Sequence, residues 1–227
     1  MSRKSTTHLN VFTRPGSVTY TLPSPPYSSP YTTITLPVGS TWTSGLHWHE
    51  THTEYLQIIS GAAIIALNNT TCIYTSSSGV ITVPRYAKHE WQRASRAQAL
   101  GYDFTPSLQT TYTQQDFDDE LIVREWTDPN DGKKEIFFRN LSGIIAHATV
   151  NKQFDWYVTL QLWILFAAMD NWPVFFQVGS LPLFGGWLER LGLARVLEWG
   201  VAHVLLWMAG VVGRVSGVRG VWAEFTP

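Results

Sequence analysis

The sequence predicts a mainly β fold that continues into a hydrophobic, helical C-terminal extension. Between residues 17 and 110, short runs rich in β-branched and aromatic residues are separated by turns of Gly, Asn and Ser, which is the pattern of a sandwich or a small barrel. Residues 151–227 carry seven of the eleven tryptophans in apolar stretches with few charges. Residues 1–16 are polar and predict a flexible N-terminal tail, and residues 111–150 predict linker and edge segments.

The turns place the predicted strands in order along the chain. Strands are expected at residues 17–22, 31–37, 55–59, 62–67, 71–75, 80–83, 88–93 and 98–104. The stretch 23–30 contains four prolines and cannot join a sheet interior, because proline has no N–H to donate. The late strands are expected to return beside the early ones in a jelly-roll topology.

Three histidines and one acid are spaced as metal ligands. His47 and His49 are two positions apart, so on a strand they face the same side. Glu54 has the opposite parity, and we expect a bulge or corner between it and His49. Together with His89 from a later strand, this set suits Fe, Mn, Ni, Cu or Zn.

These residues carry a resemblance to the cupin family over about residues 31–105. The run from His47 to Gly61 resembles the first cupin motif, HxH followed by Glu54 and then Gly at family spacing. Pro84 to His89 resembles the second motif, with Tyr86 in place of its glycine, and Thr41 and Arg93 also depart from the family pattern. The resemblance implies a jelly-roll barrel with one divalent metal ion, iron first, held by His47, His49, Glu54 and His89.

Strand parity predicts the walls of the site. Leu56 and Ile58 share the face of the acid ligand, while Trp91 and Arg93 share the face of the last histidine. We expect these four side chains to bind an apolar substrate. Two alternatives stay open, that Trp91 packs only in the core and that Arg93 pairs with Asp103.

Three further residues near the motifs are candidates for moving a proton. Tyr86 and Lys88 lie in the second motif and could supply a proton or hold an oxyanion. His52 lies between two of the predicted ligands, where it is either a base behind the metal or a residue of the rim.

Composition excludes several classes of function. The net charge is −1 and no Lys/Arg cluster forms a basic patch, so no nucleic-acid partner is expected. The sequence has no GxGxxG, P-loop, nucleophile elbow or CxxC motif. A single Cys72 and a polar N-terminus without a signal sequence predict an intracellular protein, cytoplasmic or membrane-associated, that is not secreted.

The C-terminal region allows two interpretations. The apolar runs Trp156–Met169 and Trp199–Gly213 fall short of the roughly 18–20 residues of a spanning helix. The helices either pack on the barrel or on a partner subunit, or they bring residues 154–227 to a membrane interface. There Arg190, Arg195, Arg214 and Arg219 would meet headgroups. A homodimer is expected only from the family resemblance.

The leading hypothesis is a metal-dependent cupin enzyme, an Fe(II) oxygenase that acts on an apolar small molecule. One alternative is redox-neutral catalysis by an isomerase, cyclase or lyase, in which the ion polarises a carbonyl. Another is a membrane-tethered cupin module that binds metal or ligand without chemistry.

Overall fold

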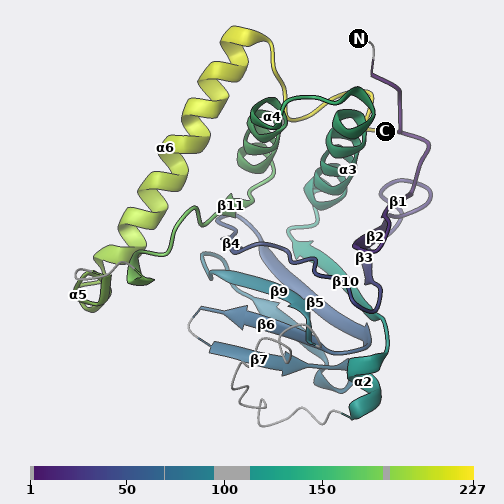
Figure 1. Cartoon of the computed structure of the whole chain (residues 1–227), viewed down its shortest axis with the longest axis vertical. Coiled ribbons are helices and arrows are strands. Elements are labelled where there is room, and N and C mark those ends of the chain that lie inside the picture. Colours follow the sequence, from purple (N-terminus) through teal and green to yellow (C-terminus); the bar gives the residue numbers. More distant parts are fainter. Residues whose placement is uncertain (1–2, 69, 95–112, 181–184) are drawn as a thin grey trace.

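A sandwich of two antiparallel sheets forms the body of the protein (Figure 1). The computed structural model describes residues 3–68, 70–94, 113–180 and 185–227. The first sheet has the order β1 (Val11–Arg14), β2 (Val18–Thr21), β3 (Thr32–Leu36), β10 (Leu121–Asp128), β5 (Thr53–Ser60), β8 (Val80–Val83). The second has the order β11 (Trp172–Pro173), β4 (His47–Trp48), β9 (His89–Arg93), β6 (Ala63–Leu67), β7 (Thr70–Tyr74).

The strands from β3 to β10 follow the jelly-roll path. The chain alternates between the sheets so that β10 returns between β3 and β5, and β9 returns between β4 and β6. Within the described ranges no ladder joins the two sheets, so the sandwich is not closed. The predicted mainly β fold with a helical C-terminal extension is confirmed.

The core lies between the two sheets and follows from strand alternation. Leu56 and Ile58 of β5, Val123 of β10, and Ile65 and Trp91 of the facing sheet are all buried in one cluster. The turn after β5 requires glycine, because Gly61 has φ +75° and a Cβ there would lie 2.6 Å from the carbonyl oxygen of Glu120.

Seven of the eight predicted strands lie within one to two residues of their predicted ends, and the eighth, 98–104, lies outside the described residues together with Asp103. Three strands were not predicted: β1, β10 and β11, the last of which lies in the region expected to be helical. β1 falls in the expected tail, and β10 falls in the expected linker although it is a central strand of its sheet. The sandwich therefore extends to residue 128 and not only to 110.

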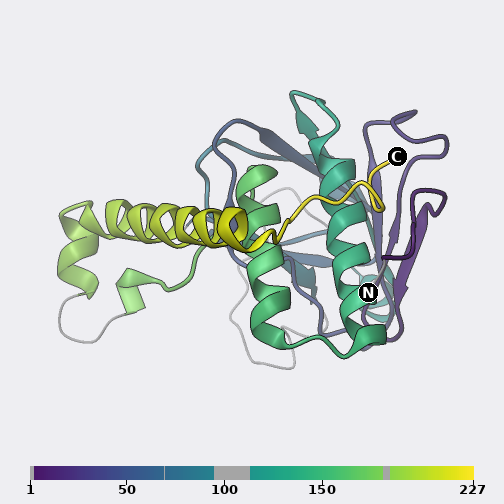
Figure 2. The same ribbon diagram turned by 90° about the horizontal axis from the view of Figure 1, so that it is seen from above.

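Helices α3 (Lys133–Asn151) and α4 (Asp155–Ala168) cover one end of the sandwich (Figures 1 and 2). The other helical elements are η1 (Ser76–Ser78), α2 (Gln114–Asp118), η2 (Val178–Ser180), α5 (Gly185–Arg190) and α6 (Leu193–Ser216). α3 and α4 stand side by side above the sheets, while α5 and α6 project away from them. The C-terminal segment returns to α3 and α4, where Phe225 packs on Ile144 and Leu165.

The helices differ from the sequence prediction in two places. α3 is 19 residues long and occupies a region that was expected to form linker and edge segments. α6 extends the apolar run 199–213 at both ends to 24 residues, so the inference that no helix reaches spanning length is wrong. In the described parts of the chain, α6 is the one helix long and apolar enough to cross a membrane by these criteria.

Candidate metal centre

The four predicted ligands come together where the two sheets meet. His47 on β4 pairs directly with His89 on β9, and Glu54 is the second residue of β5 in the other sheet. Residues 49–52 form the corner that carries the chain from one sheet to the other, as the parity of Glu54 required. All four side chains are buried, and their candidate ligand atoms lie within 4.8 Å of one another.

Backbone carbonyl groups fix the orientation of all three imidazoles. Nδ1 of His47 lies 2.7 Å from the oxygen of Gly45, Nδ1 of His49 lies 2.6 Å from the oxygen of Asp170, and Nδ1 of His89 lies 3.1 Å from the oxygen of Ala87. Because a carbonyl oxygen only accepts, each Nδ1 carries the hydrogen. Nε2 is then the ring nitrogen left for the centre of the cluster, which is the usual arrangement behind a metal-binding histidine.

The electrostatics of the cluster fit a bound cation. Burial lowers the pKa of His47 and His49, and the neighbouring imidazoles lower that of His47 further, so Nε2 of both rings offers a lone pair at neutral pH. Nε2 of His49 lies 2.9 Å from a carboxylate oxygen of Glu54. Nε2 of His89 is buried and lies 3.2 Å from the other carboxylate oxygen of Glu54, without the geometry of a hydrogen bond. Convergent acceptors of this kind suit a divalent ion, and three neutral imidazoles with one carboxylate would leave it a net charge of +1.

Lys134, which the sequence analysis missed, reaches into the cluster from the first turn of α3. Its Nζ lies 2.6 Å from Oε2 of Glu54 and also pairs with Glu125 on the inward face of β10. Burial alone would lower the pKa of Lys134, but the two carboxylates raise it above its usual value. Burial alone would raise the pKa of Glu54, but Lys134 and His89 hold it well below its usual range.

Asp170, which follows α4, clamps the corner between β4 and β5. Its carboxylate accepts hydrogen bonds from the backbone N–H groups of Glu50, Thr51 and His52, from the Thr51 hydroxyl, from His52 Nδ1 and from Trp172 Nε1, at 2.7–3.1 Å. Burial would raise the pKa of Asp170, but these donors hold it far below its usual value. In the sequence, Asp170 directly follows the apolar run Trp156–Met169, and nothing near it indicates a partner in the corner.

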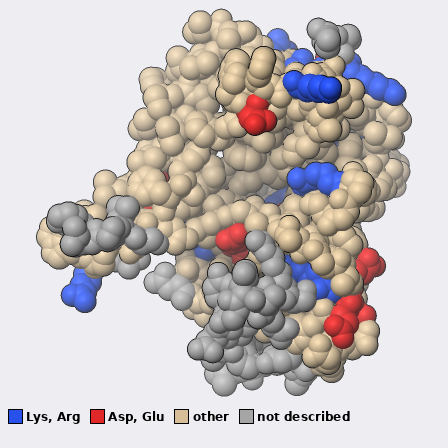
Figure 3. Space-filling view, viewed as in Figure 1, with Lys and Arg blue, Asp and Glu red and all other residues tan. Residues whose placement is uncertain are grey.

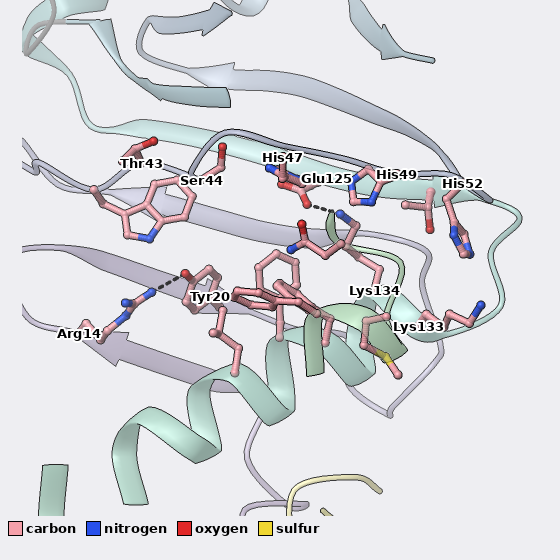
Figure 4. Close-up of a pocket in the computed structure, with 18 residues that line it drawn as sticks. Arg14, Tyr20, Thr43, Ser44, His47, His49, His52, Glu125, Lys133 and Lys134 are labelled. Carbon is pink, nitrogen blue, oxygen red and sulfur yellow. Dashed lines mark hydrogen bonds and ion pairs between the residues drawn. The ribbon is translucent and has the colours of Figure 1, made fainter. Parts of the chain in front are cut away.

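A cavity of about 210 Å³ adjoins the cluster (Figure 4). Polar groups from the strand side line one wall, among them Thr43, Ser44 and the Arg14–Tyr20 pair, whose Nη2 and Oη lie 2.5 Å apart. Apolar side chains of α3 and α4 line the other wall: Phe137, Phe138, Leu141 and Phe166. His47, His49, Glu125 and Lys134 also line the cavity, so a bound molecule would meet the cluster directly.

None of the four predicted substrate-binding residues lines this cavity. Leu56, Ile58 and Trp91 face inward as predicted but lie deeper in the core cluster. Arg93 is buried and donates from Nη2 to the carbonyl oxygens of Phe117, at 2.9 Å, and of Asp119. Alternation along a strand tells which side chains face inward. It does not tell which of the inward side chains lie beside the metal-ligand cluster and which lie in the middle of the core.

The three proton-transfer candidates separate. His52 lines the cavity and is held between Asp170, at 2.7 Å, and Asp131, at 3.2 Å. Lys88 instead forms a 2.8 Å ion pair with Glu198 of α6. Tyr86 is 47% exposed, and with Lys88 it lines a separate small recess against α6. Lys88 precedes His89 on the strand, so its side chain points to the opposite face.

Several solved structures align with part of this chain, at low TM-score and low sequence identity. No family model matches the sequence, and no curated protein matches it. KdgF from Halomonas sp. aligns with TM-score 0.33 and 14% identity over 56% of this chain and 94% of its own. A putative sugar phosphate isomerase from Acidithiobacillus ferrooxidans gives 0.29 and 15% over 43% of this chain and 47% of its own. A predicted oxalate decarboxylase from Thermotoga maritima gives 0.32 and 16% over 48% and 76%. The chemistry of the site therefore rests on its own geometry.

Proposed function

We propose that the chain is a metal-dependent cupin-type enzyme that acts on a small molecule in the cavity beside His47, His49, Glu54 and His89. One observation carries this proposal: three imidazoles, each oriented by a backbone carbonyl, converge with a buried carboxylate at the wall of a cavity. When bound, Fe(II) would supply the activation of O₂, and another divalent ion would supply a Lewis acid.

The two walls of the cavity define the substrate class. The phenylalanine side chains of α3 and α4 would hold an apolar body and exclude water. Lys134, Thr43 and Ser44 would hold an oxygen-bearing polar end near the cluster. This supports an amphiphilic small molecule and narrows the apolar substrate that the sequence predicted.

The leading reaction is oxygenation at Fe(II). It is supported by a ligand set that can hold Fe(II), among other divalent ions, and by an aromatic wall that would keep water from the reacting atoms. Lys134 stays cationic between Glu54 and Glu125, so its part would be to attract and orient an anionic or carbonyl oxygen.

The second candidate, redox-neutral proton transfer, is supported by Glu125. Its carboxyl group lies on the cavity wall, and burial together with the charge of Glu54 raises its pKa. A carboxyl group with a raised pKa keeps its proton more readily and can exchange it with a substrate. Glu125 would then be the base or acid of an isomerase, cyclase or lyase.

Nitric oxide, which binds ferrous iron as an analogue of O₂, tests the leading reaction without a known substrate. The Fe(II)-loaded chain is expected to give the electron paramagnetic resonance signal of an iron–nitrosyl centre. His49→Ala should abolish the signal, and His147→Ala, a histidine on α3 away from the cluster, should preserve it. Iron loading without nitric oxide binding would overturn the oxygenase and leave the redox-neutral candidate.

A further inference from the structure

In α6 the small residues are mainly buried and the large apolar residues are mainly exposed, which is the opposite of what is expected for a helix that covers a soluble core. The buried stripe consists mainly of small residues: Ala194, Glu198, Ala202, Leu206, Ala209 and Gly213. The exposed stripe consists of large apolar ones, with Val196 62%, Val204 54%, Trp207 68% and Val215 86% exposed. Helices of soluble proteins bury their large apolar side chains and expose polar ones. A stripe of this kind facing water would be costly along its whole length.

The small residues let α6 approach α4 closely. A Cβ at Gly213 would lie 2.5 Å from the Ile164 side chain, and a Cβ at Gly220, just after the helix, would lie 2.2 Å from the backbone nitrogen of Leu165. Close approach through Ala and Gly is how helices associate when the surrounding medium is lipid. Only 28% of the most apolar window of α6 is buried, so this contact leaves the large side chains uncovered.

The exposed stripe is too wide for a simple helix-to-helix seam. A coiled-coil seam uses two positions per heptad. In α6, neighbouring pairs are exposed together, such as Val196 with Leu197, Trp207 with Met208 and Val211 with Val212. The stripe runs the length of the 24-residue helix, about 36 Å at 1.5 Å per residue. Figure 3 shows almost no charge along this side of the molecule.

The charges at the ends of the stripe are cationic. Arg190 of α5 and Arg214 are exposed near the two ends of the stripe, whereas Arg195 turns toward the sandwich and donates to the carbonyl oxygen of Tyr86 at 2.7 Å. The one acid of α6, Glu198, is buried and paired with Lys88. Exposed arginines at both ends of an apolar stripe complement the anionic headgroups at a bilayer surface.

We propose that the exposed stripe of α6 binds the surface of a lipid bilayer that contains anionic lipids. The opposite face of the helix packs on α4, and His203 stacks on Trp172 of β11 at 4.0 Å between ring centroids. Only one side of α6 can therefore meet lipid, and the helix lies in the interface without crossing the bilayer. Trp187 and Leu191, 60% and 52% exposed, extend the apolar surface past the N-terminal end of α6.

Flotation with vesicles of phosphatidylcholine and phosphatidylserine tests the proposal on the full chain. The chain, diluted from mild detergent, is expected to float with the vesicles. Val204→Glu/Trp207→Glu should weaken the binding by at least about tenfold, because carboxylates resist insertion into the interface. The matched control Val38→Glu/Val80→Glu, at exposed valines of the sandwich, should bind like the wild type. Circular dichroism and metal content check that each variant is folded.

Three outcomes would overturn the proposal. The chain could stay with the soluble fraction, the α6 variant could float like the wild type, or analytical ultracentrifugation could show a stable dimer that the same α6 variant dissociates and that does not bind vesicles. The last result would assign the stripe to a second copy of the chain. The metal site plays no part in this readout, so the test is independent of the proposed enzyme function.

The arginines are tested separately with vesicles of phosphatidylcholine alone. Adding phosphatidylserine should strengthen the binding of the wild type, and Arg190→Gln/Arg214→Gln should remove that gain while retaining binding to phosphatidylcholine. A gain that persists in the arginine variant would overturn the part assigned to these two residues.

Discussion

The backbone carbonyl oxygen of Asp170 accepts a hydrogen bond from Nδ1 of His49 at 2.6 Å, across 121 positions of sequence. The carboxylate of the same residue holds the corner that carries His49 toward Glu54. A residue of the helical extension thus orients a ligand of the sandwich. The extension supports the candidate metal centre as well as covering one end of the sheets.

Asp170→Asn should lower both the free energy of unfolding and the affinity of the cluster for a metal ion. The amide would face backbone donors with a donor of its own, which should lower the free energy of unfolding by about 1–3 kcal/mol. Loss of the support behind a ligand should also reduce metal affinity by about 10–100-fold. Urea denaturation of the metal-free chain and titration against a chelator measure the two effects. Asp155→Asn, exposed in the first turn of α4, is the control, with an expected loss below about 1 kcal/mol.

The contribution of Asp170 to the free energy of unfolding should decrease at low pH. Its folded pKa is far below the usual value of 3.8. The folded state thus favours the carboxylate, and the stabilisation is present above pH 3.8 and is lost as the pH falls toward the folded pKa. The difference in urea midpoint between wild type and Asp170→Asn should be full at about pH 6 and shrink below about pH 4. A difference that stays constant over this range would contradict the hydrogen-bonded carboxylate.

Lys134→Met should be strongly destabilising in the metal-free chain. It would leave Glu54 and Glu125 buried without their cation, which costs about 3–5 kcal/mol. The neighbouring Lys133, whose side chain is 39% exposed, provides the control, and Lys133→Met should change stability by less than about 1 kcal/mol. The double variant Lys134→Met/Glu125→Gln should recover part of the loss. Equal effects of the two single lysine variants would show that Lys134 does not hold the acids together.

Lys88→Met tells whether this lysine has a structural role, in its ion pair with Glu198, or the predicted role in proton transfer. Because Lys88 pairs with the buried Glu198, its loss should cost about 1–3 kcal/mol in unfolding free energy. Metal content and nitric oxide binding should be unchanged, because Lys88 lies outside the cavity of the cluster. Unchanged stability with a lost nitric oxide signal would instead favour the part in the site that the sequence suggested.

Strands with clear alternation and turn residues could be predicted from the sequence, and β8 has the predicted bounds. β10 could not, because its inward Glu125 breaks the apolar alternation. That acid is tolerated only because Lys134 reaches it from the next helix. α3 was also missed, since its glycine and β-branched residues have low helix propensity and no side chain caps its N-terminus. Gly143 is needed there because a Cβ would lie 2.5 Å from the Phe225 ring.

The ligand set could be predicted because its spacing is local and regular, whereas the groups that support it come from distant segments. Lys134 and Asp170 reach the cluster from α3 and from the end of α4, and nothing near them in sequence indicates a partner. Contacts of this kind are set by packing between helices and sheets, which residue spacing does not encode.

The metal content of the purified chain tests the central claim most directly. Elemental analysis after loading with Fe(II) should find about one ion per chain. The content should fall to background in His49→Ala and His89→Ala and stay unchanged in His147→Ala. A chain that binds no ion, or that keeps its ion when His49 and His89 are replaced, would contradict a metal centre at this cluster.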